Sequence, residues 1–340
     1  MDKGWSVMDN VILYGAGTVG RTVAKKLIAS GNPPRCFADN NKAKWGTEIE
    51  GIPVVSPESA LGLHPEAKWL PTIFRASDRG EVASDLSRLG VSVIEFSIYD
   101  YLSPHHTNLP LEQNDKKIRE LLSHDKESME TYLDQLAFRR NPNYHVQRTP
   151  RDVSKVYFED FFTRRNDEHF VDCGAADGDT AREFMRQWKE WHLITAFEPD
   201  PSNYRGLRKL ENGKIDMHWS AISDHVGIEA FVATSDQSSH LGNGNVLVPV
   251  NKLDGLLRIP PTFIKMDIEG SEREALWGAR ESIRINSPVL AICAYHKGDD
   301  LWTIPLLIDS IQPNYRLFFR QYMEKSWELI WYAVPSERVI

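Results

Sequence analysis

The sequence predicts an α/β fold in two domains, and three observations support this. Near the N-terminus, an apolar run leads into the pattern Gly15-x-Gly17-x-x-Gly20 and then a helical segment. Further along, an apolar run ends in Asp172 and turns through small residues into another helix. From about residue 156, strand-like runs alternate with helical segments, which is typical of a mainly parallel sheet. Both halves are therefore expected to be Rossmann-like.

The chain has 340 residues, which is long for one hydrophobic core. We expect an N-terminal Rossmann-like module at residues 1–102, a helical connector at 103–150 and a second α/β domain at 151–340. The formal net charge of −8, without a basic stripe, argues against nucleic acid as a partner.

Three cysteines (Cys36, Cys173 and Cys293) lie far apart and inside or beside apolar runs. They predict reduced core residues rather than disulfides or a zinc site. The N-terminal residues lack the layout of a signal peptide, and no apolar run has the length of a membrane span. We therefore expect a cytoplasmic protein with no membrane partner.

The N-terminal module carries a dinucleotide fingerprint in its expected context. The strand before Gly15 is followed by a helix at 21–30, and a strand at 35–38 ends at Asp39, about twenty residues past the glycines. This indicates a possible second nucleotide site made of Gly15, Gly17, Gly20 and Asp39. The alternative is a module whose glycines only permit a tight turn and close helix packing. Further strands are expected at 52–55, 72–74 and 91–94.

Apolar residues at three- and four-residue intervals predict two connector helices that pack one face on a domain. The second domain is expected to have strands at 169–173, 193–198, 217–222, 262–267, 289–295, 316–321 and 328–334. Residues 227–250 are expected to form a hairpin with a loop. The last two strands leave no room for a helix between them and should pair antiparallel.

The turn after the first of these strands reads Asp172-x-Gly174-x-Ala176-x-Gly178, and the next strand ends in Glu198. In doubly wound folds, a carboxylate at the end of this second strand binds the hydroxyls of a ribose. The two strand ends together predict a nucleotide-type ligand site.

A seven-stranded sheet that ends in an antiparallel hairpin is the architecture of class I S-adenosylmethionine-dependent methyltransferases. The segment Lys265-x-Asp267-x-Glu269-Gly270-x-Glu272, together with the first motif, resembles the FkbM family of methyltransferases over about residues 157–334. The resemblance implies S-adenosyl-L-methionine as cofactor. The cofactor-binding residues that it implies are Asp172, Gly174, Ala175, Gly178, Glu198 and Asp224.

Asp267 and Glu269 follow a strand expected beside the first, and His296 follows the next strand. This is the switch point where ligands bind, so the candidate catalytic residues are Asp267, His296 and Glu269. Either His296 or Asp267 is a candidate general base. Two capping boxes are expected, Thr180 with Glu183 and Ser271 with Glu274.

The function predicted is O-methylation of a hydroxyl on a sugar, glycan or small metabolite. The alternative is an oxidoreductase or binding protein that uses the N-terminal glycine motif for NAD or a nucleotide-sugar. Asp267, Glu269 and His296 are enough ligands for a divalent metal, but their spacing does not require one, so no metal is expected. The acceptor and the oligomeric state are not readable from the sequence.

Overall fold

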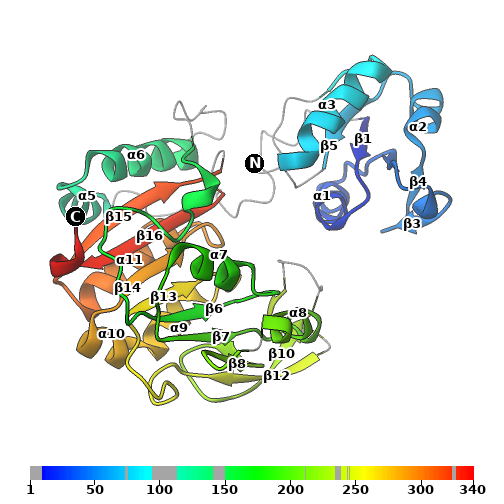
Figure 1. Cartoon of the computed structure of the whole chain (residues 1–340). Coiled ribbons are helices and arrows are strands. Elements are labelled where there is room, and N and C mark those ends of the chain that lie inside the picture. The colour runs from blue at the N-terminus through cyan, green and yellow to red at the C-terminus, as the bar shows by residue number, and fades with distance from the viewer. Residues whose placement is uncertain are drawn as a thin grey trace. The chain divides into compact units, whose positions relative to one another are not determined.

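The computed structural model describes residues 10–72, 76–93, 113–140, 150–210, 212–233, 239–242, 244, 246–323 and 327–340. The chain divides into two compact units, Met1–Ser103 and Pro104–Ile340 (Figure 1). Within the described residues, no helix is both long enough and apolar enough to span a membrane.

The N-terminal unit is built on a five-stranded sheet of order β3-β4-β2-β1-β5. Its strands are β1 (Val11–Tyr14), β2 (Cys36–Ala38), β3 (Glu48–Ile49), β4 (Ile52–Val55) and β5 (Lys68–Pro71). Its helices are α1 (Thr18–Ala29), η2 (Lys42–Lys44), α2 (Pro57–Leu63) and α3 (Ala76–Leu89). β1 pairs in parallel with both β2 and β5, and only the short β3 runs antiparallel. This is the Rossmann-like arrangement that the sequence predicted.

Three N-terminal boundaries differ from the prediction. α1 begins at Thr18, so it includes Gly20. The strand expected at 72–74 lies at Lys68–Pro71, because these residues are in register with β1; residues 73 and 74 are outside the described residues. Of the strand expected at 91–94, Val93 makes one isolated bridge to Trp69, and residue 94 is not described.

The C-terminal unit contains a seven-stranded sheet of order β15-β16-β14-β13-β6-β7-β8. Its strands are β6 (His169–Cys173), β7 (Leu193–Phe197), β8 (Ile215–His218), β13 (Phe263–Met266), β14 (Val289–Cys293), β15 (Tyr315–Gln321) and β16 (Leu329–Pro335). The five strands from β14 to β8 are parallel, whereas β16 pairs antiparallel with both β14 and β15. The class I methyltransferase-like sheet with its terminal hairpin is therefore confirmed.

Helices cover this sheet (Figure 1). They are α5 (Asp115–Leu122), α6 (Lys126–Arg140), α7 (Asp179–Gln187), α8 (Pro201–Leu207), α9 (Glu272–Gly278), α10 (Arg280–Asn286) and α11 (Asp300–Ile311), with 3-10 turns at Val153–Lys155, Arg208–Leu210 and Ser336–Arg338. α5 and α6 belong to the core of this unit, since Ile118 and Leu136 pack in the cluster that contains Val171. Ser128 also accepts a 2.8 Å hydrogen bond from the amide of Phe319 in β15.

A second, four-stranded sheet of order β11-β10-β12-β9 lies in the same unit. Its strands are β9 (Ala221–Ile222), β10 (Gly227–Val232), β11 (His240–Leu241) and β12 (Val246–Asn251). The antiparallel pairing of β10 with β12 confirms the predicted hairpin. The single strand expected at 217–222 is wrong. It is divided between two sheets, because β8 pairs with β7 while β9 pairs with β12.

Neither predicted capping box forms. The N-cap of α7 is Gly178, in a left-handed conformation with φ 89, so Thr180 is already inside the helix. Glu183 instead pairs with Arg186. Ser271 does occupy the N-cap of α9, but its side chain makes no capping hydrogen bond.

The two central strands are linked by an ion pair that is removed from water. Lys265 of β13 and Asp172 of β6 are partners in register, and their side chains are 2% and 0% exposed. The Lys265 Nζ lies 3.0 Å from Asp172 Oδ1 and donates to the carbonyl of Gly174 at 2.8 Å. Burial alone would lower the pKa of Lys265, but Asp172 and Asp267 raise it above its ordinary value. The ammonium therefore stays charged.

We expect Lys265→Met to lower the free energy of unfolding by about 3–5 kcal/mol, because it leaves the Asp172 carboxylate buried without its partner. Denaturant titration followed by circular dichroism measures this. The double variant Asp172→Asn/Lys265→Met should be more stable than Lys265→Met alone, since it removes both charges. Equal destabilisation in the two proteins would contradict the role given to the ion pair.

Candidate active site

The predicted site residues meet at one edge of the seven-stranded sheet. Because β6, β7, β13 and β14 are parallel neighbours, their carboxyl ends lie side by side. The turn that follows β6, Glu198 after β7, Asp267 after β13 and His296 after β14 therefore share this edge. This is the switch point at which open α/β sheets bind ligands.

Glu198 is bound to the turn after β6 by its carboxylate. Oε2 accepts from the amide of Ala176 at 2.8 Å, and Oε1 accepts from the amide of Asp200 at 2.7 Å. Ala176 takes the left-handed conformation with φ 46, although it has a Cβ. Glu198 is 5% exposed, and this burial raises its pKa to about 7 despite the two amide donors. Each oxygen keeps a second lone pair for a ligand hydroxyl.

The small residues of this turn are required by contacts within the protein. A Cβ on Gly174 (φ 81) would lie 1.9 Å from the carbonyl oxygen of Asp267, and one on Gly178 would lie 2.3 Å from Leu210 Cδ1. Ala175 is buried, and its amide bonds the carbonyl of Phe197. Both glycines have positive φ, and a Cβ on Gly174 would also meet backbone, so contacts within the protein require them whether or not a cofactor binds there.

Asp172 does not reach the surface of the site. It is fully buried and paired with Lys265, which in turn bonds the carbonyl of Gly174. Asp172, expected among the cofactor-binding residues, therefore holds the turn through Lys265, and its contact with a cofactor stays a prediction.

Asp267 is the carboxylate with the most defined surroundings. Tyr157 donates its hydroxyl to Oδ2 at 2.9 Å, and Tyr295 donates to Oδ1 at 3.2 Å. Burial would raise the pKa of Asp267, but Lys265, His296 and the hydrogen bond from Tyr157 lower it below its ordinary value. Asp267 is therefore ionised at neutral pH and keeps a fixed orientation.

His296 lies among three carboxylates. Its Nδ1 is 2.8 Å from Glu272 Oε1, and its Nε2 is 3.5 Å from Asp267 Oδ1 and 3.6 Å from Glu269 Oε2. Burial favours the neutral ring, but Glu272 and then Glu269 and Asp267 raise the pKa of His296 to about 10. In this arrangement the ring is protonated at neutral pH and has no lone pair with which to act as a base.

Asp224 has a separate partner. Its carboxylate is 45% exposed and lies 2.8 Å from His225 Nδ1. The residue follows β9 of the smaller sheet, and its role in cofactor binding stays a prediction. The residue that directly follows β8 is Trp219, whose indole donates a hydrogen bond to the carbonyl of Pro199.

In the N-terminal unit, the glycine loop uses Asp39 for its own structure. One Asp39 oxygen accepts from the amide of Ala16 at 2.7 Å and from Lys44 Nζ at 3.0 Å, and the other accepts from Asn41. A Cβ on Gly20 would lie 2.1 Å from the carbonyl of Gly15, whereas one on Gly17 would meet nothing within 4 Å. Close packing thus explains the glycine at position 20, whereas a Cβ at position 17 would have open space around it.

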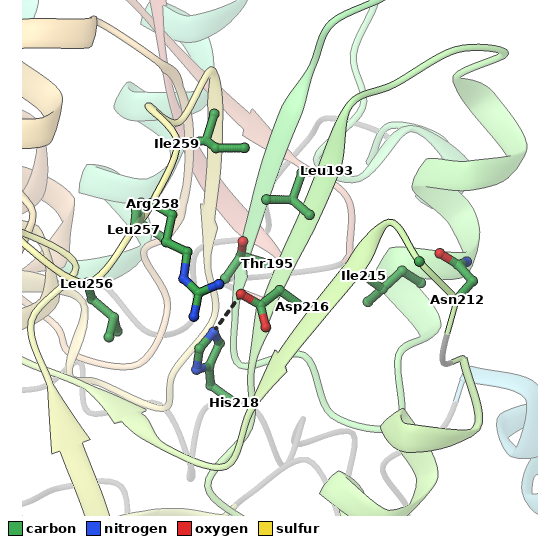
Figure 2. A pocket seen from close by; sticks show the side chains of 11 residues that line it. Leu193, Thr195, Asn212, Ile215, Asp216, His218, Leu256, Leu257, Arg258 and Ile259 are labelled. Atoms are coloured by element: carbon green, nitrogen blue, oxygen red, sulfur yellow. Dashed lines mark ion pairs between the residues drawn. The ribbon is translucent and has the colours of Figure 1, made fainter.

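A cavity of about 370 Å³ lies over β7 and β8, away from these residues. Figure 2 shows Asp216, His218 and Arg258 gathered at one part of it, with Leu193 and Ile215 at another. The sequence motifs contribute no side chain to its lining. We therefore place the candidate active site at the strand ends rather than in this cavity.

Comparison with known proteins identifies a domain within the C-terminal unit. Residues 172–325 match the family model described as Methyltransferase FkbM domain. These residues form an FkbM methyltransferase domain. A methyltransferase of this family implies S-adenosylmethionine as methyl donor. The chain has no match among curated proteins.

Solved structures agree on the fold. A methyltransferase FkbM from Methylobacillus flagellatus KT is 23% identical, with a TM-score of 0.68, and the match covers 96% of this chain and 90% of that one. A UDP-D-quinovosamine 4-dehydrogenase from Vibrio fischeri is 25% identical over 25% of this chain and 75% of its own, with a TM-score of 0.22. At these identities the first likeness shows the fold, and the second is too limited to support an argument.

Several residues of the site carry no recognisable signal of their role in the sequence. Lys265 and Glu272 lie in the quoted motif, but only the structure pairs them with Asp172 and His296. Tyr157 comes from the loop before β6 and has no motif of its own. No local sequence signal could have found Tyr157, because its partner is 110 residues away.

We expect the affinity for S-adenosylhomocysteine to rise about tenfold between pH 6 and pH 8. A carboxyl with a pKa of about 7 is mostly protonated at pH 6 and mostly ionised at pH 8, and the ionised form accepts both ribose hydroxyls. Isothermal titration calorimetry at the two pH values measures this. In the control Glu198→Gln the rise should vanish. A pH-independent affinity of the wild type would contradict this role for Glu198.

Proposed function

We propose that the FkbM domain transfers a methyl group from S-adenosylmethionine to a hydroxyl of a sugar, glycan or small metabolite. The observation that carries the proposal is the ionised Asp267, which two tyrosine hydroxyls orient at the strand end beside the turn that binds Glu198. Methyl transfer to oxygen requires a base in a fixed position beside the bound methyl donor. Asp267, next to Glu198, would meet this requirement.

The residues present fit the methyl donor. Glu198 offers two oxygens to the ribose hydroxyls, and the left-handed turn at 174–178 presents backbone groups beside it. Asp267 and Glu269 supply negative charge at the same edge, which favours a ligand that carries a sulfonium. When bound, the donor supplies an electrophilic methyl group.

In this proposal Asp267 accepts the proton of the acceptor hydroxyl as the oxygen forms its bond to the methyl carbon and the carbon–sulfur bond breaks. Tyr157 and Tyr295 hold the carboxylate so that one lone pair faces the acceptor. His296, protonated between its carboxylates, orients this group and is not the base. Of the two bases left open by the sequence, the geometry favours Asp267.

The alternative, an NAD- or nucleotide-sugar-binding function of the N-terminal unit, has less support. Gly17 leaves open space, as a pyrophosphate-binding loop would. Both oxygens of Asp39, however, are already engaged by Ala16, Lys44 and Asn41. A ribose would have to compete with these donors for the carboxylate.

A thermal-shift comparison separates the two functions. We expect S-adenosylhomocysteine to raise the melting temperature, and NAD, NADH and UDP-sugars to leave it unchanged. Glu198→Ala should weaken the binding of S-adenosylhomocysteine at least tenfold without unfolding the protein, because charged hydrogen bonds contribute about 1.5–3 kcal/mol each. The melting temperature of the free protein should also fall, since the amides of Ala176 and Asp200 lose their acceptor. Stabilisation by NAD or a UDP-sugar alone would contradict the proposal.

We expect Asp267→Asn to lower the methyl-transfer rate by about 10²–10⁴-fold, because the amide cannot accept the proton. The measurement is transfer of a labelled methyl group from S-adenosylmethionine to a cell extract, followed by identification of the labelled product. Affinity for S-adenosylhomocysteine should change little. Asp160→Asn, an exposed carboxylate paired with Lys155, is the control that should keep full activity. An Asp267→Asn protein with wild-type rate would remove Asp267 from the chemistry.

A further inference from the structure

The turn between β15 and β16 places an acidic side chain, Glu328, at the edge of the sheet where the candidate site lies. The amide of Ala294, directly after β14, donates to the carbonyl of Leu329 at 2.8 Å. Because β14 and β16 are antiparallel, Glu328 lies opposite Tyr295. The neighbouring Trp327 packs on the Tyr295 ring with a centroid distance of 5.6 Å. The start of β16 is therefore fixed beside the carboxyl end of β14.

The carboxyl group of Glu328 faces the candidate site. The charged groups that act on it come from β13, from the turns after β13 and β14 and from the start of α7; they are Lys265, Asp267, His296 and Asp179. Because these groups meet at the strand ends, the Glu328 carboxyl lies over the same edge. Burial and the nearby Asp267 raise the pKa of Glu328 to about 7, although His296 and Lys265 oppose this rise.

Glu328 holds this position at a cost to folding. Its backbone is left-handed, with φ 51, a conformation that favours glycine over residues with a Cβ. Its carboxylate makes no hydrogen bond or ion pair with any residue that the structure describes. A partly buried carboxyl without such a partner, beside another carboxylate, is unfavourable for the folded protein alone. Contact with a ligand explains why this side chain is directed to the site.

We propose that Glu328 binds the methyl acceptor by accepting a hydrogen bond from a hydroxyl adjacent to the one that is methylated. The inference rests on the proposed function, in which Asp267 accepts the proton of the reacting hydroxyl. The two carboxylates then engage two hydroxyls of one molecule, so the acceptor is a compound with vicinal hydroxyls, such as a sugar or another polyol. An alcohol without the second hydroxyl would leave Glu328 unpaired, and a site of this kind discriminates against it.

Sodium periodate tests the acceptor class, because it cleaves the carbon–carbon bond between vicinal hydroxyls and leaves isolated hydroxyls intact. The full-length protein receives labelled S-adenosylmethionine and a cell extract that has been treated with periodate and then quenched with sulfite. We expect the labelled product to fall at least tenfold relative to an extract treated with sodium iodate in the same way. Labelling that resists periodate would overturn the proposal.

Glu328→Gln tests the residue itself. The amount of untreated extract that gives half the maximal rate should rise at least tenfold, because the charged hydrogen bond to the acceptor is lost. The maximal rate and the affinity for S-adenosylhomocysteine should change little, since Asp267 and Glu198 are intact. The melting temperature should not fall, because the change removes a charge that has no partner; a purely structural role would lower it. Glu337→Gln, exposed just beyond β16, is the matched control and should behave like the wild type.

The outcomes distinguish this inference from the proposed function. If the wild type labels nothing in the untreated extract, both are overturned. If the wild type labels a product and Glu328→Gln reaches half its maximal rate at the same amount of extract, this inference alone is overturned. The periodate comparison uses the wild type, so it decides the acceptor class even if the Glu328→Gln protein does not fold, as circular dichroism will show.

Discussion

The buried pair of Lys265 and Asp172 is the interaction on which the candidate site depends. It joins the two central strands of the seven-stranded sheet, and its ammonium also bonds the carbonyl of Gly174. The two turns that follow these strands are thereby fixed to each other. Because Glu198 is bound to one turn and Asp267 begins the other, this contact helps to hold the two carboxylates in a fixed arrangement.

The groups around this pair carry more negative than positive charge. Lys265 and His296 are positive groups surrounded by the carboxylates of Asp172, Asp267, Glu269 and Glu272. Carboxylates outnumber cations here, and in a partly desolvated site such an excess attracts positive ligands strongly. A sulfonium is a ligand of this kind.

Much of the fold could be predicted from the sequence, because its signals are local. Apolar runs predicted the parallel strands. The interval between residues 321 and 329 is too short for a helix, and this predicted the terminal hairpin. Candidate site residues could be predicted only where a motif residue directly follows a strand, as Glu198 and Asp267 do. The role of Tyr157 and the division of residues 215–222 between two sheets depend on contacts between distant segments. The capping boxes were wrong because α7 begins after Gly178, before Thr180, and because the Ser271 side chain makes no capping hydrogen bond.

The acidic residue of the N-terminal glycine loop is used within the loop itself. Asp39 closes the loop from within, by the amide of Ala16 and the ammonium of Lys44. A ribose that replaced these donors would exchange one set of charged hydrogen bonds for another of similar strength, about 1.5–3 kcal/mol each, so the exchange would yield little net affinity.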